Sequence, residues 1–489
     1  MPIPLIIITS SIILLYKLDL FPHPWFDEGY STNAARTLVE QGVYGTYTSE
    51  RLLPLDPGVS TGPTVILPLA LSYAVLGPGI VQSRIVVVVF ALIGVVILYR
   101  VAVYLYGPQA GLIAVMMAIS FPTIDNISYL LLGRQVLGEV PGIALIMLGL
   151  LLWFHSWDRT QALWGFVAVV AMGLGIIAKI QLAIGIIPAI FLVILARQIK
   201  QPIPWIKAFT VLGISVGLVA MWMIFQRLGP PEALRAEFAA TLTEAGKTHF
   251  LAPSFGRFLN RYGFMLSGVA GLAAATTAWR LIGHFRLTHR LDNPQWAELT
   301  FLLSVLISTG WFVILSIGWP RYMIFTLVIS LLLLGRPLWE MLNRSIPLPI
   351  PYVTVGAALL LALFALGSNI RLIGVSVDDS GVTQMARYID NQVPANAVIE
   401  SWAWEIDALT THREYHHPHQ FDLYTAIQQQ VQERQSFNIG YDMLKANPDY
   451  ILTNEFSDCT QIYDPDILSS EFDCVAEFGL YSLYKKVPN

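Results

Sequence analysis

The chain has 489 residues, of which 55% are hydrophobic and only 13% are charged, and its mean hydropathy is +0.60. Soluble domains carry about 25% charged residues, so this composition excludes an ordinary soluble protein and indicates a polytopic membrane protein. The formal net charge of -4 gives no sign that the chain binds nucleic acid.

The first feature along the chain is a series of apolar segments, about eleven of which we expect to cross the membrane as helices. The first has no small-residue cleavage site after it, so we interpret it as a retained span rather than a signal peptide. The predicted spans are Pro4–Leu20, Arg84–Tyr106, Ala110–Ile124, Leu137–Phe154, Leu163–Ala178, Ile180–Ala196, Ala208–Phe225, Tyr262–Leu281, Leu299–Ile317, Tyr322–Gly335 and Tyr352–Ser368.

Basic residues in the short loops predict the orientation, because such residues are enriched on the cytoplasmic side. They all fall on one side of the span count, which places the N-terminus in the cytoplasm of a multi-pass protein of the plasma (inner) membrane. An odd number of spans then places the C-terminal part outside. The basic residues are Arg100, Arg159, Arg197, Lys200, Lys207, Arg280, Arg286, Arg290, Arg336 and Arg344.

The first outer loop, residues 21–83, contains the stretch HPWFDEGYSTNAARTLVEQGVYG. Its adjacent acids Asp27 and Glu28 stand before a predicted amphipathic helix over Ser31–Gln41, with Ser31 as its N-cap and Gly42 as its end. The acids then have a simple structural explanation, since carboxylates suit the positive end of a helix. The apolar stretch TGPTVILPLALSYAVL follows at residues 61–76 and predicts a second helix at the outer interface.

Other charged and polar residues interrupt apolar stretches, and each has a structural explanation of its own. Arg134 and Glu139 could form an ion pair within a loop, Lys179 could reach lipid headgroups, and Arg321 with Tyr322 could anchor a helix at the interface. All of them map to the same face of the membrane as Asp27. Together they predict a cavity with carboxylates for a hydroxyl-bearing or metal-bound group and cations for a phosphate.

The C-terminal part, residues 376–489, is polar, and we expect a small extracytoplasmic α/β domain after a membrane domain over residues 1–375. Cys459 and Cys474 are the only cysteines, and whether they form a disulfide stays open. The predicted helices are Gly381–Gln392 and Phe421–Gln435, and the predicted strands are Ala397–Ser401, Tyr450–Thr453 and Val475–Lys485.

The same domain contains the stretch THREYHHPHQ, with histidines at His412, His416, His417 and His419. Pro418 breaks any helix that could align them, and no nearby cysteine or carboxylate completes a structural zinc site. We therefore predict a solvated loop rather than a metal centre.

These motifs in their order resemble the GT-C membrane glycosyltransferases, in the branch of protein-O-mannosyltransferases and lipid A aminoarabinose transferases. The likeness rests on FDEGY after a first span, on GRQVLGEVPG, on GLGIIAKIQLAIGIIP and on RYMIFTLVISLLL, and covers most of residues 21–334. The chain departs from many relatives in having Thr61 and Gly62 before Pro63, where those carry Lys-Pro-Pro, and Glu139 in place of an aspartate.

The resemblance implies an enzyme that moves a sugar from a polyprenyl-phosphate donor to a hydroxyl on the outer face of the membrane, with inversion. It implies Asp27 as the catalytic base, with Glu28 following it and Glu139 as the second acid. Lys179 and Arg321 fall where carrier-phosphate contacts are expected, and Arg134 and Tyr322 complete the predicted binding set. A divalent metal ion held by Glu28 and Glu139 stays open.

The acceptor, which could be a lipid, a protein or a glycan, also stays open. Two other interpretations remain. The first is a transporter or flippase of a lipid-linked sugar, which would place its binding groups near the bilayer midplane. The second is a membrane-anchored sensor whose C-terminal domain performs the recognition.

Overall fold

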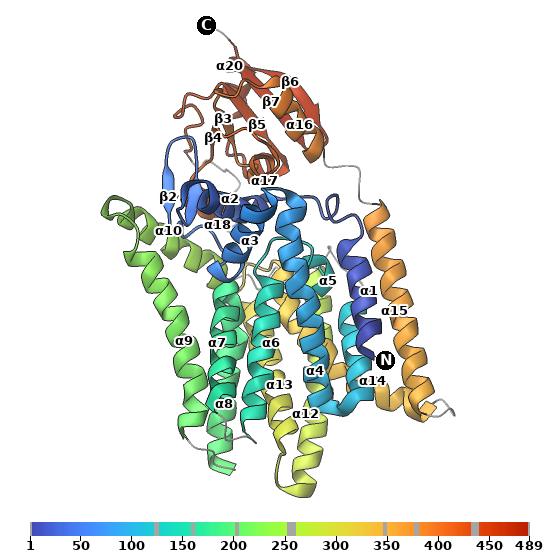
Figure 1. The fold of residues 1–489 in the computed structure, drawn as a ribbon. Helices are drawn as coiled ribbons and strands as arrows, with labels where there is room; N and C mark the ends of the chain where they lie inside the picture. Colours follow the sequence, from blue (N-terminus) through green and yellow to red (C-terminus); the bar gives the residue numbers. More distant parts are fainter. Residues whose placement is uncertain are drawn as a thin grey trace.

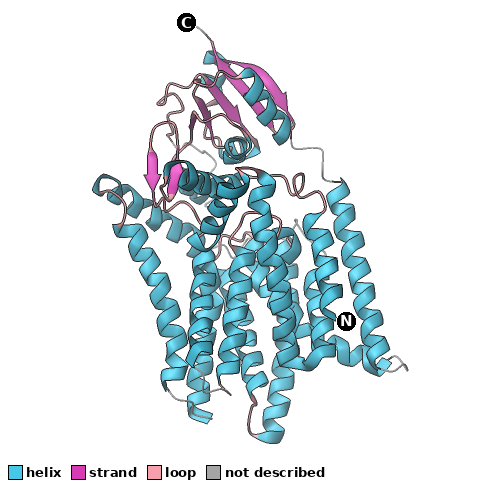
Figure 2. Ribbon diagram, in the orientation of Figure 1, coloured by secondary structure: helices cyan, strands magenta, loops and turns pink. Residues whose placement is uncertain are grey.

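The protein is built in two layers, with a long helical bundle on one side and a small domain containing a β-sheet on the other (Figure 1; Figure 2). A group of shorter helices lies between them, at the end of the bundle that faces the C-terminal domain. The computed structural model describes residues 2–121, 127–157, 162–200, 205–251, 261–345, 350–375, 381–431 and 440–487.

The bundle confirms the prediction of a multi-pass helical membrane protein. Within the described ranges, eight helices are long and apolar enough to cross a membrane, and three shorter apolar helices accompany them. The bundle helices are α1 (Pro2–Leu15), α4 (Ile80–Ser120), α6 (Glu139–Ser156), α7 (Ala162–Ala178), α8 (Ala183–Lys200), α9 (Trp205–Leu228), α12 (Arg261–Thr288), α13 (Asn293–Ile314), α14 (Ile324–Ser345) and α15 (Ile350–Val375).

Helix α4 contains two of the predicted spans, and two further predicted spans correspond to α1 and α7, which are among the shorter apolar helices. The number of long helices is therefore smaller than the number of predicted spans. Gly107 has a φ of 81° inside this helix and Pro108 follows it, so the helix is broken there. A Cβ on Gly111 would lie 2.9 Å from the Val103 backbone nitrogen, so the chain turns back on itself at this point.

The group of helices between the bundle and the C-terminal domain contains α2 (Phe26–Gln41) and α3 (Pro63–Leu76), joined by a two-stranded hairpin. Helix α3 packs against α2, α4 and α7, as expected of a helix at the end of the bundle. The remaining short elements are β1 (Gly45–Tyr47), β2 (Leu52–Pro54), α5 (Tyr129–Leu132), the 3-10 helix η1 (Ile180–Leu182), α10 (Glu232–Phe250) and the 3-10 helix η2 (Pro320–Met323).

Helix α2 differs from its prediction at its start and in its surroundings. It begins at Phe26 with Trp25 at the N-cap, and the Ser31 hydroxyl donates to the Asp27 carbonyl, so the predicted cap at Ser31 is wrong. The end at Gly42, with φ 71°, is confirmed. The helix is buried over residues 28–37 because the C-terminal domain packs against it.

The C-terminal domain confirms the predicted α/β class with a five-stranded sheet in the order β4-β3-β5-β7-β6. Strand β3 pairs in parallel with β4 and β5, whereas β7 is antiparallel to both β5 and β6. Its elements are α16 (Val382–Gln392), β3 (Ile399–Ser401), α17 (Trp404–Leu409), β4 (Tyr415–His416), α18 (Gln420–Val431), β5 (Tyr450–Thr453), α19 (Glu455–Thr460), α20 (Pro465–Glu471), β6 (Phe472–Phe478) and β7 (Tyr481–Lys486). Residues 432–435 of the predicted second helix lie outside the described residues.

The prediction of a solvated histidine loop is wrong, because three of the four histidines are buried. His416 lies between Glu400 and Glu50, and the His417 ring stacks on Trp404 with centroids 3.7 Å apart. The loop follows β4 into the contact between the C-terminal domain and the first loop, so tertiary packing covers it. Cys459 and Cys474 are both exposed and free, so the disulfide left open by the sequence is not formed in the structure.

Helix α17 holds α2 in place through a buried ion pair. Asp407 accepts from Arg36 Nη1 at 3.0 Å and from Asn33 Nδ2 at 2.7 Å, and both charged side chains are about 95% buried. One turn earlier, Gly29 lets the backbones meet, since a Cβ there would lie 2.2 Å from the Trp404 carbonyl carbon. The two helices are therefore packed backbone to backbone next to Asp27.

Replacing Gly29 with alanine should destabilise the protein by about 1–3 kcal/mol, because the added methyl group must push two backbones apart. The expected result is a lower melting temperature in detergent. Gly213→Ala is the matched control, since a Cβ at that helical glycine meets no atom of the described residues within 4 Å. Equal melting temperatures for the two variants would contradict the backbone contact.

Candidate active site

Asp27 lies in the first turn of α2, where the helix dipole favours a negative charge. Its carboxylate accepts from Arg321 Nη1 at 2.5 Å, and its side chain remains 20% exposed to a small cavity. The guanidinium comes from η2, and its carbon lies 4.9 Å from the ring centroid of Trp25 and 4.8 Å from that of Trp319. This aromatic surrounding fixes the arginine against the carboxylate, as cation–π contacts do.

Lys179 lies on the same cavity and connects it with Glu139. The lysine is the N-cap residue of η1 and is 98% buried, so it does not reach toward lipid headgroups. Its Nζ lies 3.3 Å from Glu139 Oε1 and 3.3 Å from Ser60 Oγ. Gly138 makes this approach possible, since a Cβ there would lie 1.9 Å from the Ala178 carbonyl oxygen.

Two adjoining cavities thus bring together five of the seven predicted site residues. The Asp27 cavity, of about 30 Å³, is lined by Asp27, Lys179, Arg321 and Tyr322 among others. The Glu139 cavity, of about 20 Å³, shares the last three of these residues and adds Glu139. Each site has one carboxylate, and the two cations and the tyrosine lie between them.

His249, on α10, completes this group and was missed by the sequence analysis. Its Nδ1 lies 2.8 Å from the Tyr322 hydroxyl, and its ring meets Tyr424 of α18 edge to face. Burial, with the positive charges of Lys179 and Arg321, lowers the pKa of His249 to about 3, so the imidazole is neutral at physiological pH. A lone histidine in a polar helix gave no signal of this position.

The structure does not bring Glu28 to the cavity, although it is next to Asp27 in sequence. Its two oxygens accept from Arg84 Nε at 2.8 Å and Nη2 at 2.7 Å, and the Val136 amide donates to it at 3.1 Å. Both side chains of this bidentate pair are fully buried. Glu28 therefore attaches α2 to α4, and the predicted catalytic and metal-binding roles do not suit its geometry.

Arg134 is likewise a structural residue rather than a phosphate contact. Its guanidinium is fully buried and donates to the backbone carbonyls of Ile13, Tyr16, Lys17 and Phe21, at the end of α1 and just after it. Carbonyls at a helix end run out of intrahelical partners, and the arginine supplies donors to them, although the Lys17 carbonyl also accepts from the Leu20 and Phe21 amides. It forms no ion pair with Glu139, which pairs with Lys179 instead.

The residues present do not suit a bound divalent metal. Nowhere in the described part of the chain do three or more histidine, cysteine or acidic side chains gather as a metal site requires. Glu28 is occupied by Arg84, and Glu139 has a lysine at the position where a second acidic ligand would be needed. Among the described residues that line the two cavities, Lys179 and Arg321 are the positively charged side chains.

An apolar groove of about 520 Å³ opens next to the Asp27 cavity. The two share the lining residues Ser60, His249 and Tyr424, so they adjoin each other. The groove runs between α7, α9 and α10, and its apolar lining includes Ile177, Val219, Trp222, Met223, Ile224, Leu242 and Phe250. This apolar lining suits a hydrocarbon chain, and the polar end of such a chain would lie toward Lys179 and Arg321 in the Asp27 cavity.

The comparisons with known proteins agree with this arrangement. Residues 60–224, about a third of the chain, match the family model of dolichyl-phosphate-mannose-protein mannosyltransferases. No curated protein matches the chain in sequence.

Solved structures share the fold over nearly the whole chain. ArnT from Cupriavidus metallidurans in the apo state superposes with a TM-score of 0.69 at 13% identity, covering 99% of this chain and 97% of that one. The same protein bound to undecaprenyl phosphate gives 0.66 at 14% identity, covering 99% and 98%.

A third structure, the Archaeoglobus fulgidus oligosaccharyltransferase in complex with Zn and sulfate, gives a TM-score of 0.59 at 12% identity, covering 99% of this chain and 73% of that one. The expected GT-C fold is confirmed, and the family match together with this fold indicates a glycosyltransferase.

Proposed function

We propose that the protein transfers a sugar from a polyprenyl-phosphate donor to a hydroxyl group of an acceptor, with Asp27 as the general base. The observation that carries the proposal is the meeting of Asp27 with Lys179 and Arg321 in a cavity that adjoins the apolar groove. A lipid-linked sugar needs an apolar channel, a cationic site for its phosphate and a carboxylate beside the sugar, and these three lie next to one another.

The reaction in this proposal is a single displacement. Asp27 takes the proton of the acceptor hydroxyl, the acceptor oxygen bonds to the anomeric carbon, and the bond from that carbon to the phosphate oxygen breaks. The polyprenyl phosphate leaves with the bonding electrons, and the configuration at the anomeric carbon inverts. A phosphate is already a good leaving group, so the second carboxyl role of glycoside hydrolysis is not needed.

The cations stabilise the negative charge that grows on the leaving phosphate. Arg321 donates a hydrogen bond from Nη1 to Asp27. Its buried Nε has no hydrogen-bond partner in the described residues and is available to a phosphate oxygen. Lys179 lies close to both carboxylates and supplies the second positive charge. Glu139 keeps the lysine between the two cavities.

The proposed membrane orientation places this site on the outer face of the plasma membrane, with the N-terminus in the cytoplasm. It is supported by the basic residues of the short loops, two of which, Arg280 and Arg336, lie over the same Tyr106 ring. Nucleotide sugars are cytosolic, so an enzyme on the outer face requires a lipid-carried donor.

The test is an assay of the purified protein in proteoliposomes with a radiolabelled polyprenyl-phosphate sugar. We expect the label to move from the lipid to acceptor or water, with inversion of the anomeric carbon seen by NMR. Movement of the intact donor between leaflets without cleavage would instead establish the transporter interpretation and overturn the proposal.

Filling the apolar groove should weaken donor binding selectively. Gly246→Trp adds a large side chain to the groove wall, and a Cβ at this position meets no described atom within 4 Å, so the helix can accept it. We expect the KM for the donor lipid to rise about tenfold while a water-soluble short-chain donor is affected less. Gly217→Trp, on the exposed side of α9, is the control and should leave both values unchanged.

Removing the charge of Arg321 should change the pH dependence of the reaction. Burial alone would raise the pKa of Asp27, but Arg321 and Lys179 outweigh it and hold that pKa below its ordinary value of 3.8. The parent should therefore show no acid limb in kcat/KM from Asp27 above about pH 5. In Arg321→Gln, only Lys179 of these two cations still lowers the pKa of Asp27 against the effect of burial. The pKa should therefore rise, and the acid limb should move to higher pH.

The measurement is kcat/KM between about pH 4 and 8 for the parent, for Arg321→Gln and for the control Lys247→Gln. Lys247 lies on α10 in an exposed pair with Glu244, so its variant should keep the parent profile. Coincident acid limbs in Arg321→Gln and the parent would contradict the proposed electrostatic role.

A further inference from the structure

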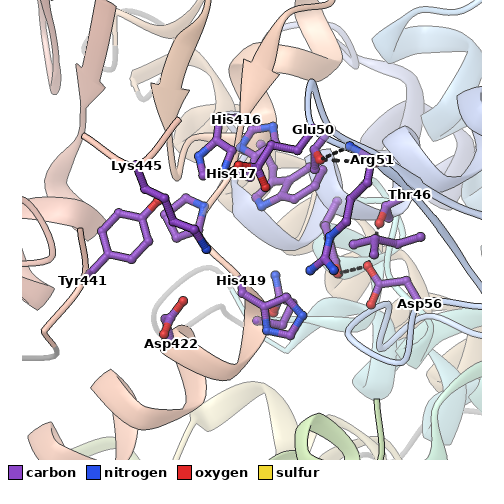
Figure 3. A pocket seen from close by; sticks show the side chains of 16 residues that line it. Thr46, Glu50, Arg51, Asp56, His416, His417, His419, Asp422, Tyr441 and Lys445 are labelled. Carbon is purple, nitrogen blue, oxygen red and sulfur yellow. Dashed lines mark hydrogen bonds and ion pairs between the residues drawn. The ribbon is translucent and has the colours of Figure 1, made fainter. Parts of the chain in front are cut away.

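A second polar space adjoins the Asp27 cavity on the side of the C-terminal domain. We call it the interdomain pocket; it has a volume of about 100 Å³ (Figure 3). One wall comes from the first loop, with Thr46, Glu50, Arg51 and Asp56 labelled in the figure. The opposite wall comes from the C-terminal domain, with His416, His417, His419, Asp422, Tyr441 and Lys445 labelled.

The interdomain pocket is next to the Asp27 cavity. Tyr30 and Gln420 line both the interdomain pocket and the Asp27 cavity. Tyr30 is one turn after Asp27 on α2, and its hydroxyl donates to Asp56 at 2.5 Å. A molecule in the interdomain pocket could thus extend a group past Tyr30 to the base.

The lining has the chemistry of a site for hydroxyl groups. Asp56 accepts from Tyr30, from the Thr46 hydroxyl at 2.6 Å and from the Gly58 amide at 2.8 Å, so this wall is fixed. Glu50 is 41% exposed in its side chain and faces His416 at 3.2 Å. Acids and bases alternate around the space, which suits a neutral ligand with many hydroxyls better than an anion or a hydrocarbon.

Two buried donors inside this lining have no hydrogen-bond partner among the described residues. They are the Gln420 side-chain amide Nε2 and the Trp404 indole Nε1, on residues 95% and 98% buried. Leaving a buried donor unsatisfied costs about 1–3 kcal/mol, so such groups call for an explanation. A ligand oxygen at the junction of the two cavities would satisfy Gln420.

We propose that the interdomain pocket binds the acceptor, and that the acceptor is a neutral carbohydrate chain. This inference rests on the proposed function and names the substrate class of the same site. One sugar of the acceptor occupies the interdomain pocket between the first loop and the C-terminal domain. The hydroxyl beside Tyr30 then gives its proton to Asp27 and its oxygen to the anomeric carbon of the donor, and polyprenyl phosphate leaves.

The first experiment measures binding without turnover. Saturation-transfer NMR on the full-length protein in detergent, with a set of neutral oligosaccharides as the probes, should show contact in the parent. The double variant Glu50→Gln/Asp422→Asn should lose most of this signal, because each carboxylate offers hydrogen bonds to sugar hydroxyls. Glu471→Gln, an exposed acid of the same domain that does not line the interdomain pocket, is the control.

The second experiment measures transfer from the labelled donor to the oligosaccharide that binds. The double variant should raise the KM for the oligosaccharide about tenfold or more while the KM for the donor lipid changes far less, because neither residue lines the apolar groove. Such a split separates an acceptor site from a general loss of structure.

Equal binding and equal KM in the parent and the double variant would overturn the acceptor proposal, as would absence of binding to every neutral oligosaccharide. Transfer to a threonine-containing peptide or to a phosphate-bearing lipid, unaffected by the double variant, would also overturn it. Failure of the proposed function can be distinguished from failure of the acceptor proposal. In the first case the parent would leave the donor uncleaved, whereas oligosaccharide binding is measured in a separate experiment.

Discussion

Replacing Asp27 with asparagine should reduce sugar transfer by at least about 100-fold, because the variant keeps the shape of the side chain and loses the proton acceptor. Among the described residues, Asp27 is the only acidic residue that lines the Asp27 cavity, which Lys179 and Arg321 also line. The amide can still contact Arg321, so donor binding should change far less than turnover.

The measurement compares kcat and donor KM of the variant with those of the parent in proteoliposomes, together with the melting temperature of each. Glu40→Gln is the matched control, since it lies on the same helix in a surface pair with Arg413. We expect parent activity from the control. Activity of Asp27→Asn within a few-fold of the parent would remove Asp27 as the base.

Replacing the next residue, Glu28, with glutamine should damage folding instead of chemistry. The change breaks a fully buried bidentate pair and leaves the Arg84 guanidinium uncompensated, which costs about 3–5 kcal/mol. The expected result is a large fall in melting temperature and in the yield of monodisperse protein. Arg84→Gln should have a similar effect, because either change leaves a buried charge alone.

The control for this prediction is Glu340→Gln, which breaks a half-exposed pair with Arg336 on α14 and should cost about 0–1 kcal/mol. If Glu28→Gln had a melting temperature as high as that of the control but lost activity, Glu28 would instead take part in the reaction. Measurements of turnover and of melting temperature would thus distinguish the role of Asp27 from that of Glu28.

The sequence identified features that depend on local patterns. Apolar runs located the spans, and basic loops together with the span count placed Asp27, Glu139, Lys179 and Arg321 on one face. These four residues do meet, since helix ends at one face of a bundle lie close together. The strand at Tyr450–Thr453 was likewise predicted with its observed bounds.

What the sequence could not supply are partners from distant parts of the chain. Nothing local separates Asp27 from Glu28; their roles differ because α2 turns one toward Arg321 and the other toward Arg84. Likewise, His416 and His417 read as a polar loop, and only the docking of this loop against the first loop and α17 buries them. His249 acquires its role from Tyr322, which lies 73 residues away.

The clamping of α2 between Arg84 on one side and Asp407 on the other has a consequence for biosynthesis. The first of these partners leaves the ribosome early, whereas the second belongs to the last quarter of the chain. During membrane insertion, the helix that holds Asp27 thus lacks its second attachment until translation is nearly finished. We expect a chain terminated before α17 to insert its spans and to remain inactive, so that activity appears only in the finished protein.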